Sequence, residues 1–111
     1  MSKALIEKIR KAREQNVTAG GHTFTVRRPT DGELAYLPDN QTYTLLCRFV
    51  VGWDFHELDI IPGGGPEPVP FDAAVWAEWI GDRSDLWLEL GAPLLTSYKA
   101  HEESLRAAAK N

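Results

Sequence analysis

Few side chains in this sequence could do covalent or metal chemistry. The candidate metal ligands are the three histidines, His22, His56 and His101, and the single cysteine, Cys47. None of them stands at a paired ligand spacing such as CxxC or HExxH, which favours surface histidines over a metal site. Cys47 falls on the apolar face of an expected core helix, where burial makes a thiol unreactive. One cysteine also excludes an internal disulfide.

The patterns of catalytic and nucleotide-binding sites are also missing. The sequence has no GxSxG turn to hold a nucleophilic serine. The glycine run 63–65 is followed by prolines rather than by Lys-Ser/Thr, so amide donors that could hold a phosphate are lost. Asp54, Glu57 and Asp59 form a carboxylate group that any acidic chain provides by chance. We therefore expect no enzyme, no catalytic residue and no cofactor.

Charge is distributed unevenly along the chain. Residues 1–28 hold seven Lys/Arg and two Glu, whereas residues 29–89 hold two Arg and twelve acids. The net charge of −4 over 111 residues argues against general nucleic-acid binding. Solvated surface accounts for most such charge, but a basic end and an acidic middle also allow head-to-tail self-association or capture of a basic partner.

Nothing in the sequence predicts a membrane partner. No apolar run approaches the roughly 18 residues of a membrane span. The charged start, residues 1–8, lacks the apolar stretch and cleavage site of a signal peptide. A lone cysteine also agrees with a reducing compartment. We therefore expect the protein in the cytosol.

The first elements are an amphipathic helix and a β-hairpin. Ser2 is a candidate cap for a helix to about Gln15, in which Leu5, Ile9 and Ala12 recur at helical spacing. Residues 16–26 alternate in the manner of a half-buried hairpin. Its turn is at residues 20–21, a Gly-Gly pair that tolerates the positive φ of tight turns.

Helices should follow the hairpin. Thr30 and Glu33 form a capping-box pattern before a short helix. Asp39 or Asn40 should cap a core helix that ends at about Val51. The Pro/Gly-rich stretch 62–70 is expected to be a loop.

The last third of the chain is also expected to be helical. Asp72 and Ser84 are candidate caps for two helices. Gly91 and Pro93 indicate a break, with a fresh helix from about Pro93 to Ala109. The sequence thus predicts one domain, 1–111, that is mainly α with a short β-hairpin, or alternatively α+β. Residues 1–15 and 99–111 are expected to be mobile terminal helices.

Exposed apolar side chains are the candidates for partner binding. Tryptophan is frequent at binding hot spots, although core filling is its commoner role. Trp76 and Trp79 cannot both point the same way as the neighbouring apolar residues, so we expect one of them to be partly exposed. The predicted contacts are Trp76 and Trp79 together with Leu5, Ile9 and Leu105 of the terminal helices.

Four stretches together resemble small tailed-phage proteins of the tail assembly chaperone family. They are Phe24–Thr30, Val51–Trp53, Pro68–Asp72 and Trp79–Trp87. The resemblance implies that the chain is a short form that coats the tape measure protein until tail tube subunits polymerise around it. A longer frameshifted form would recruit the tail tube protein. Two other functions stay open: a tail or head-tail completion subunit of the particle, and a small phage-encoded inhibitor of a host protein.

Overall fold

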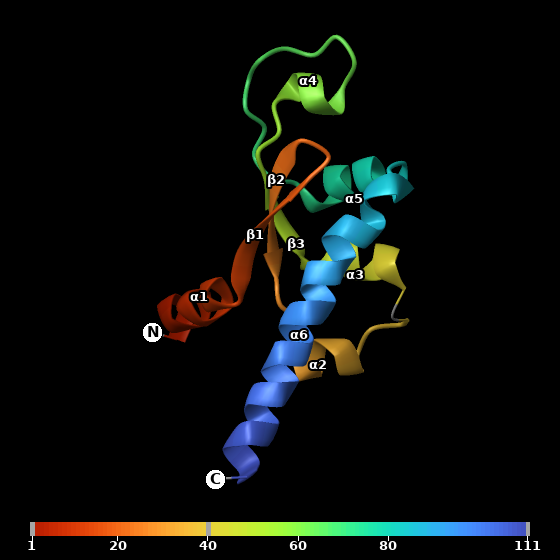
Figure 1. The fold of residues 1–111 in the computed structure, drawn as a ribbon. Helices are drawn as coiled ribbons and strands as arrows, with labels where there is room; N and C mark the ends of the chain where they lie inside the picture. The colour runs from red at the N-terminus through yellow and green to blue at the C-terminus, as the bar shows by residue number, and fades with distance from the viewer. Residues whose placement is uncertain (1, 40, 111) are drawn as a thin grey trace.

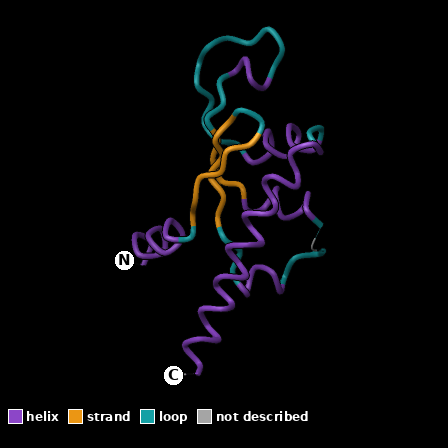
Figure 2. Tube along the Cα trace, viewed as in Figure 1, coloured by secondary structure: helices purple, strands orange, loops and turns teal. Residues whose placement is uncertain are grey.

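A computed structural model describes residues 2–39 and 41–110 of the chain. It shows a mixed α+β fold in which helices predominate around a three-stranded sheet (Figure 1, Figure 2). The helices are α1 (Ser2–Ala12), α2 (Asp31–Ala35), α3 (Thr42–Phe49), α4 (Glu57–Ile60), α5 (Ala73–Gly81), the 3-10 turn η1 (Ser84–Leu86) and α6 (Trp87–Lys110). The strands are β1 (Glu14–Ala19), β2 (His22–Arg27) and β3 (Val50–Trp53).

The sheet is antiparallel with the order β1-β2-β3. The predicted hairpin is confirmed: β1 and β2 pair from Glu14↔Arg27 to Ala19↔His22. Gly20 and Gly21, with φ of 59° and 80°, make a two-residue turn that suits the twist of paired strands. The third strand was not predicted. It begins at Val50, because helix α3 ends at Phe49 and not at about Val51 as predicted.

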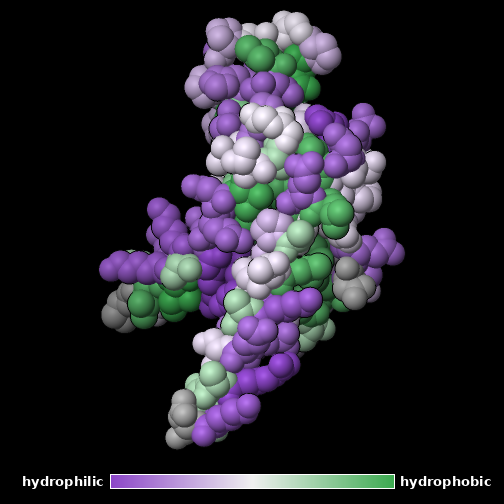
Figure 3. All heavy atoms as spheres, in the orientation of Figure 1, coloured by the Kyte–Doolittle hydropathy of each residue, from purple (hydrophilic) through white to green (hydrophobic). Residues whose placement is uncertain are grey.

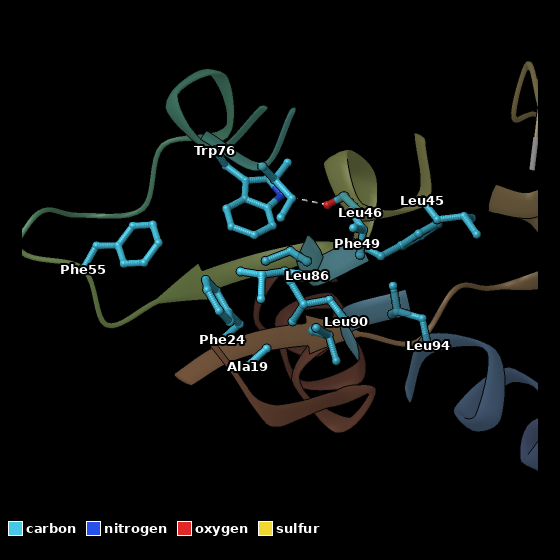
Figure 4. Packing of buried hydrophobic residues seen from close by; sticks show 13 residues of the cluster. Ala19, Phe24, Leu45, Leu46, Phe49, Phe55, Trp76, Leu86, Leu90 and Leu94 are labelled. Carbon is cyan, nitrogen blue, oxygen red and sulfur yellow. Dashed lines mark hydrogen bonds between the residues drawn. The ribbon is translucent and has the colours of Figure 1, made fainter. Parts of the chain in front are cut away.

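The core lies between the sheet and the helices α3, α5 and α6 (Figure 4). Leu86, Leu90 and Leu94, which recur every fourth residue, are all buried. Three indole N–H groups donate to backbone carbonyls: Trp76 to Leu46, Trp53 to Val69 and Trp87 to Ile80. The fully or nearly fully buried hydrophobic residues are Ala19, Phe24, Val26, Leu45, Leu46, Phe49, Val50, Phe55, Trp76, Ile80, Leu86, Leu90 and Leu94.

Two helix caps are confirmed. The Thr30 hydroxyl accepts from the Glu33 amide at 3.0 Å, while the Glu33 carboxylate accepts from the Thr30 amide at 3.2 Å. The Asp72 carboxylate accepts from the Ala74 and Val75 amides in the first turn of α5, at 2.9 and 3.0 Å.

Two other predicted caps differ. Ser84 begins η1, and the cap is Arg83. The cap of α3 is Gln41, whose amide donates to Asp39, and Asn40 lies outside the described residues.

Two helix ends differ from the prediction. The first helix ends at Ala12 rather than near Gln15, because the chain from Glu14 onward pairs with β2. The predicted break near Gly91 is absent, and α6 runs through Pro93 without interruption. Gly91 lets α6 approach α3 closely, since a Cβ there would lie 3.0 Å from the Thr42 methyl. Burial of the leucines on either side offsets the cost of about 3 kcal/mol for an interior proline.

The Pro/Gly loop 62–70 folds back onto α4, a short helix that was not predicted (Figure 1). The Glu57 amide donates to the Glu67 carbonyl at 2.9 Å, and the Leu58 amide donates to the Gly65 carbonyl at 3.0 Å. The Val69 amide donates to the Phe55 carbonyl at 2.9 Å. The loop is therefore held by backbone hydrogen bonds along much of its length.

Both terminal helices project from this body (Figure 1). Helix α1 contains no buried residue, and the chain of α6 beyond residue 102 is exposed throughout its described part. Within residues 2–39 and 41–110, no helix combines the length and apolarity that a membrane span requires.

Candidate protein-binding surfaces

The first candidate surface is the α1 stripe, formed by Leu5, Ile6 and Ile9. These side chains are 61%, 44% and 43% exposed. They fall on one side of the helix because residues three and four apart share a face. Lys8 and Arg10 flank the stripe, and Figure 3 shows the apolar side of α1 next to its hydrophilic side. The predicted contacts Leu5 and Ile9 are therefore both exposed.

The second candidate surface is the Trp79 groove, which lies beside α5 and the start of the Pro/Gly loop. It has a volume of about 400 Å³. Trp79 is half-buried, and its ring stacks on the buried Trp76 ring at 5.8 Å between centroids. The groove is lined by Ile60, Pro62, Val75, Glu78, Trp79, Asp82 and Arg83.

Charges on the rim of the Trp79 groove are mostly negative. Glu78 and Asp82 are exposed. The Arg83 guanidinium lies 5.1 Å from the centre of the Trp79 ring and donates to both carboxylate oxygens of Asp85, at 3.0 and 2.9 Å. This hydrogen bonding lowers the pKa of Asp85 and raises that of Arg83. Arg83 is therefore already paired, and Glu78 and Asp82 give the rim its acidic character.

The third candidate surface is the α6 groove, an apolar hollow of about 330 Å³ where α6 crosses α2 and α3. Its most exposed apolar member is Leu95, at 54%. Leu105 follows Leu94 by eleven residues, about three helical turns, so both lie on one face of α6. Leu105 is 52% exposed. The groove is lined by Pro29, Leu34, Thr42, Leu45, Leu94, Leu95 and Tyr98.

Two contacts tie α6 to the body just before it projects. The Tyr98 hydroxyl donates to Asp31 at 2.6 Å, and His101 lies 3.7 Å from the same carboxylate. The hydrogen bond from Tyr98 lowers the pKa of Asp31, and the bond to this carboxylate raises the pKa of Tyr98 to about 12. These contacts therefore fix the position of α6 at the point where it leaves the body.

The prediction that Trp76 contacts a partner is wrong. Trp76 is completely buried, and its indole N–H donates to the Leu46 carbonyl at 2.9 Å. Its position one turn before Ile80 places both on the core side of α5, while Trp79 is turned toward the surface. Of the two adjacent tryptophans, only Trp79 can therefore reach a partner.

The other predicted contacts lie in three separate places. Leu5 and Ile9 are on α1, Trp79 is on α5, and Leu105 is near the end of α6. The sequence prediction missed the α6 groove. Its signal is the adjacent pair Leu94 and Leu95, because two neighbouring residues on a helix cannot both face the core.

The histidines and loop carboxylates come together partly, as structural contacts. His22 Nδ1 lies 3.1 Å from Asp54 Oδ1, and His22 Nε2 lies 3.9 Å from Asp59 Oδ1. The His56 amide donates to Asp59 at 2.8 Å, which lowers the pKa of Asp59. These contacts join the hairpin turn to α4.

Metal chemistry and the free thiol offer no site. In the described part of the chain, no three His, Cys, Asp or Glu side chains are grouped to hold a metal ion. Cys47 packs against the core but is only partly buried, less than predicted. Comparisons with family models, with curated proteins and with solved structures found no match, so the functional argument depends on the surfaces themselves.

Proposed function

We propose that this chain is a tailed-phage tail assembly chaperone that binds the tape measure protein in the host cell cytoplasm. The observation that carries the proposal is the face of α6 on which Leu90, Leu94 and Leu105 lie. Its first half, including Leu90 and Leu94, is covered by the core, whereas its second half, including Leu105, is uncovered. A partner helix could cover the exposed half of this face in the same way that the core covers the other half.

The α6 groove provides the place where such a partner helix would begin. Leu95 stands at its edge, and Tyr98 marks the point where α6 leaves the body. An amphipathic segment of the client would set apolar side chains into the groove and continue toward Leu105. This binding is non-covalent and requires no cofactor.

The acidic surface serves the same function. Residues 29–89 hold twelve acids against two arginines, which keeps a complex with an aggregation-prone client in solution. In this proposal the short chain covers the tape measure protein, and a longer frameshifted form brings the tail tube protein to it.

The test is a pull-down of tagged protein from phage-producing cells, with partners identified by mass spectrometry. We expect a long helical tape measure protein in the eluate and no bait in finished virions. Bait in the virion would instead indicate a permanent tail or head-tail completion subunit. Capture of a host or defence protein without the tape measure protein would indicate an inhibitor.

Matched leucine variants locate the contact. Leu95→Asp with Leu105→Asp should abolish capture of the tape measure protein, because Leu95 stands at the edge of the groove and Leu105 is exposed on the proposed face. Leu88→Asp is the control, because Leu88 is 80% exposed on the same helix and does not line the groove. Leu88→Asp should leave the free energy of unfolding within about 0.5 kcal/mol of the original value, whereas Leu95→Asp and Leu105→Asp should each lower it by about 1 kcal/mol or less, because these two side chains are less exposed. Equal loss of capture in the Leu88 control would contradict the assignment.

A further inference from the structure

Helix α1 has an apolar stripe that its own fold does not use. Leu5, Ile6 and Ile9 are all exposed, and no residue of α1 is buried. An isolated helix of 11 residues is marginally stable in water, so propensity alone does not explain this amphipathic pattern. The monomer therefore leaves this apolar stripe uncovered.

The charges of α1 limit what can cover this stripe. The helix carries Lys3, Lys8, Arg10 and Lys11 against the single acid Glu7. Lys8 and Arg10 lie on the two sides of the stripe. The matching surface is therefore an apolar groove with carboxylates along its edges.

The Trp79 groove has this composition. Its apolar lining includes Ile60, Val75 and Trp79, and its rim carries Glu78 and Asp82. The surrounding sequence, residues 54–85, holds eight acids and one arginine. That arginine, Arg83, is neutralised by Asp85 at 2.9 Å. The groove thus offers both the apolar contact and the negative charge that α1 lacks.

We propose that α1 of one copy docks into the Trp79 groove of a second copy, so that the chain self-associates head to tail. Helices α1 and α5 lie on opposite sides of the sheet in Figure 1, and a single residue, Arg13, joins α1 to β1, so α1 is not placed to fold back into the groove of its own chain. A contact between two different surfaces leaves one of each unused at the ends of a dimer. Further copies can therefore add, and the product is a chain of copies or a closed ring.

The contact is small and charged, which determines how it should behave. One short helix in one groove falls at the low end of specific interfaces, below about 1,200 Å². Association should therefore depend on protein concentration. It should also weaken at least about fivefold in affinity between low and high salt, because exposed charges are screened.

The experiment uses the purified full chain and measures mass by sedimentation velocity across a concentration series. The α1 variant is Leu5→Ser with Ile9→Ser, and the groove variant is Glu78→Lys with Asp82→Lys. All four residues are exposed, so both variants should keep the circular dichroism spectrum of the original chain. Leu88→Ser is the control for loss of an exposed leucine, and it should assemble like the original chain.

Mixing the two variants gives the decisive result. Each variant alone should be monomeric, and an equimolar mixture should form a 1:1 dimer and nothing larger. The intact α1 of one variant then meets the intact groove of the other. No dimer in the mixture, an α1 variant that still assembles, or an original chain that stays monomeric at about 1 mM would each overturn the proposal.

A lipid surface is the competing occupant for a basic amphipathic helix. Co-sedimentation with vesicles of anionic phospholipid tests it directly. Binding to vesicles by a chain that stays monomeric in solution would overturn self-association in favour of lipid. Self-association needs no tape measure protein, so its result is independent of the proposed chaperone function.

Discussion

Replacement of Trp76 by phenylalanine tests the assignment of this residue to the core. Phenylalanine keeps an aromatic ring but lacks the indole nitrogen and two ring carbons. Loss of two buried carbons costs about 1.6 kcal/mol, at about 0.8 kcal/mol each. Loss of the hydrogen bond to Leu46 costs about 1 kcal/mol more, and not the larger penalty of an unpaired carbonyl, because that oxygen still accepts from the Val50 amide. The free energy of unfolding should therefore fall by about 2.5 kcal/mol.

Trp79→Phe is the matched control, three residues along the same helix. Trp79 is only half-buried, so its replacement should cost about 1 kcal/mol or less. Urea unfolding followed by far-UV circular dichroism measures both variants, since tryptophan fluorescence changes with the substitutions themselves. The reasoning is refuted when Trp76→Phe unfolds within about 0.5 kcal/mol of the original chain, or when Trp79→Phe costs as much as Trp76→Phe.

Three further substitutions test local features. Partial burial alone would raise the pKa of Glu33, but hydrogen bonds from Arg27 and the helix cap outweigh it and lower the pKa. A lowered folded pKa gives stability that is present above the unfolded pKa and is lost as the pH falls through the folded pKa. The difference in urea midpoint between the original chain and Glu33→Gln should therefore shrink below about pH 4.5. Gly20→Ala should cost about 1–2 kcal/mol in urea unfolding, because its positive φ is strained and its Cβ would lie 3.0 Å from Leu86. Pro93→Ala should raise the melting temperature, because a proline in a helix interior costs up to about 3 kcal/mol and the substitution removes this cost.

Local signals in the sequence were sufficient for the hairpin and for two helix caps. The Gly20-Gly21 turn, the Thr30 box and the Asp72 cap each depend on residues within a few positions of one another. The physical cause of each feature is therefore contained in a short window. The i, i+4 spacing of the buried leucines of α6 is a signal of the same kind.

The features that were missed depend on contacts between distant segments. Residues 42–53 carry a single charge, Arg48, and only pairing with β2 turns the end of this stretch into β3. The α6 helix continues through Pro93 because of its packing, which single-residue preferences do not include. For the candidate surfaces, Leu5, Ile9 and Leu105 could be identified from helical spacing. Trp76 could have been assigned to the core from its i, i+4 partner Ile80.

Helix α1 buries no residue, so the fold of the monomer does not supply the free energy that would stabilise it. Ordering the backbone costs about 1–2 kcal/mol per residue, and α1 returns none of this through core contacts. A helix made only of polar residues would be solvated equally well. Leu5, Ile6 and Ile9 nevertheless share one face of α1, with cations on both sides. The proposed self-association would account for this pattern. Leu105 likewise lies on a core face past the end of the core, and the proposed partner helix would cover it.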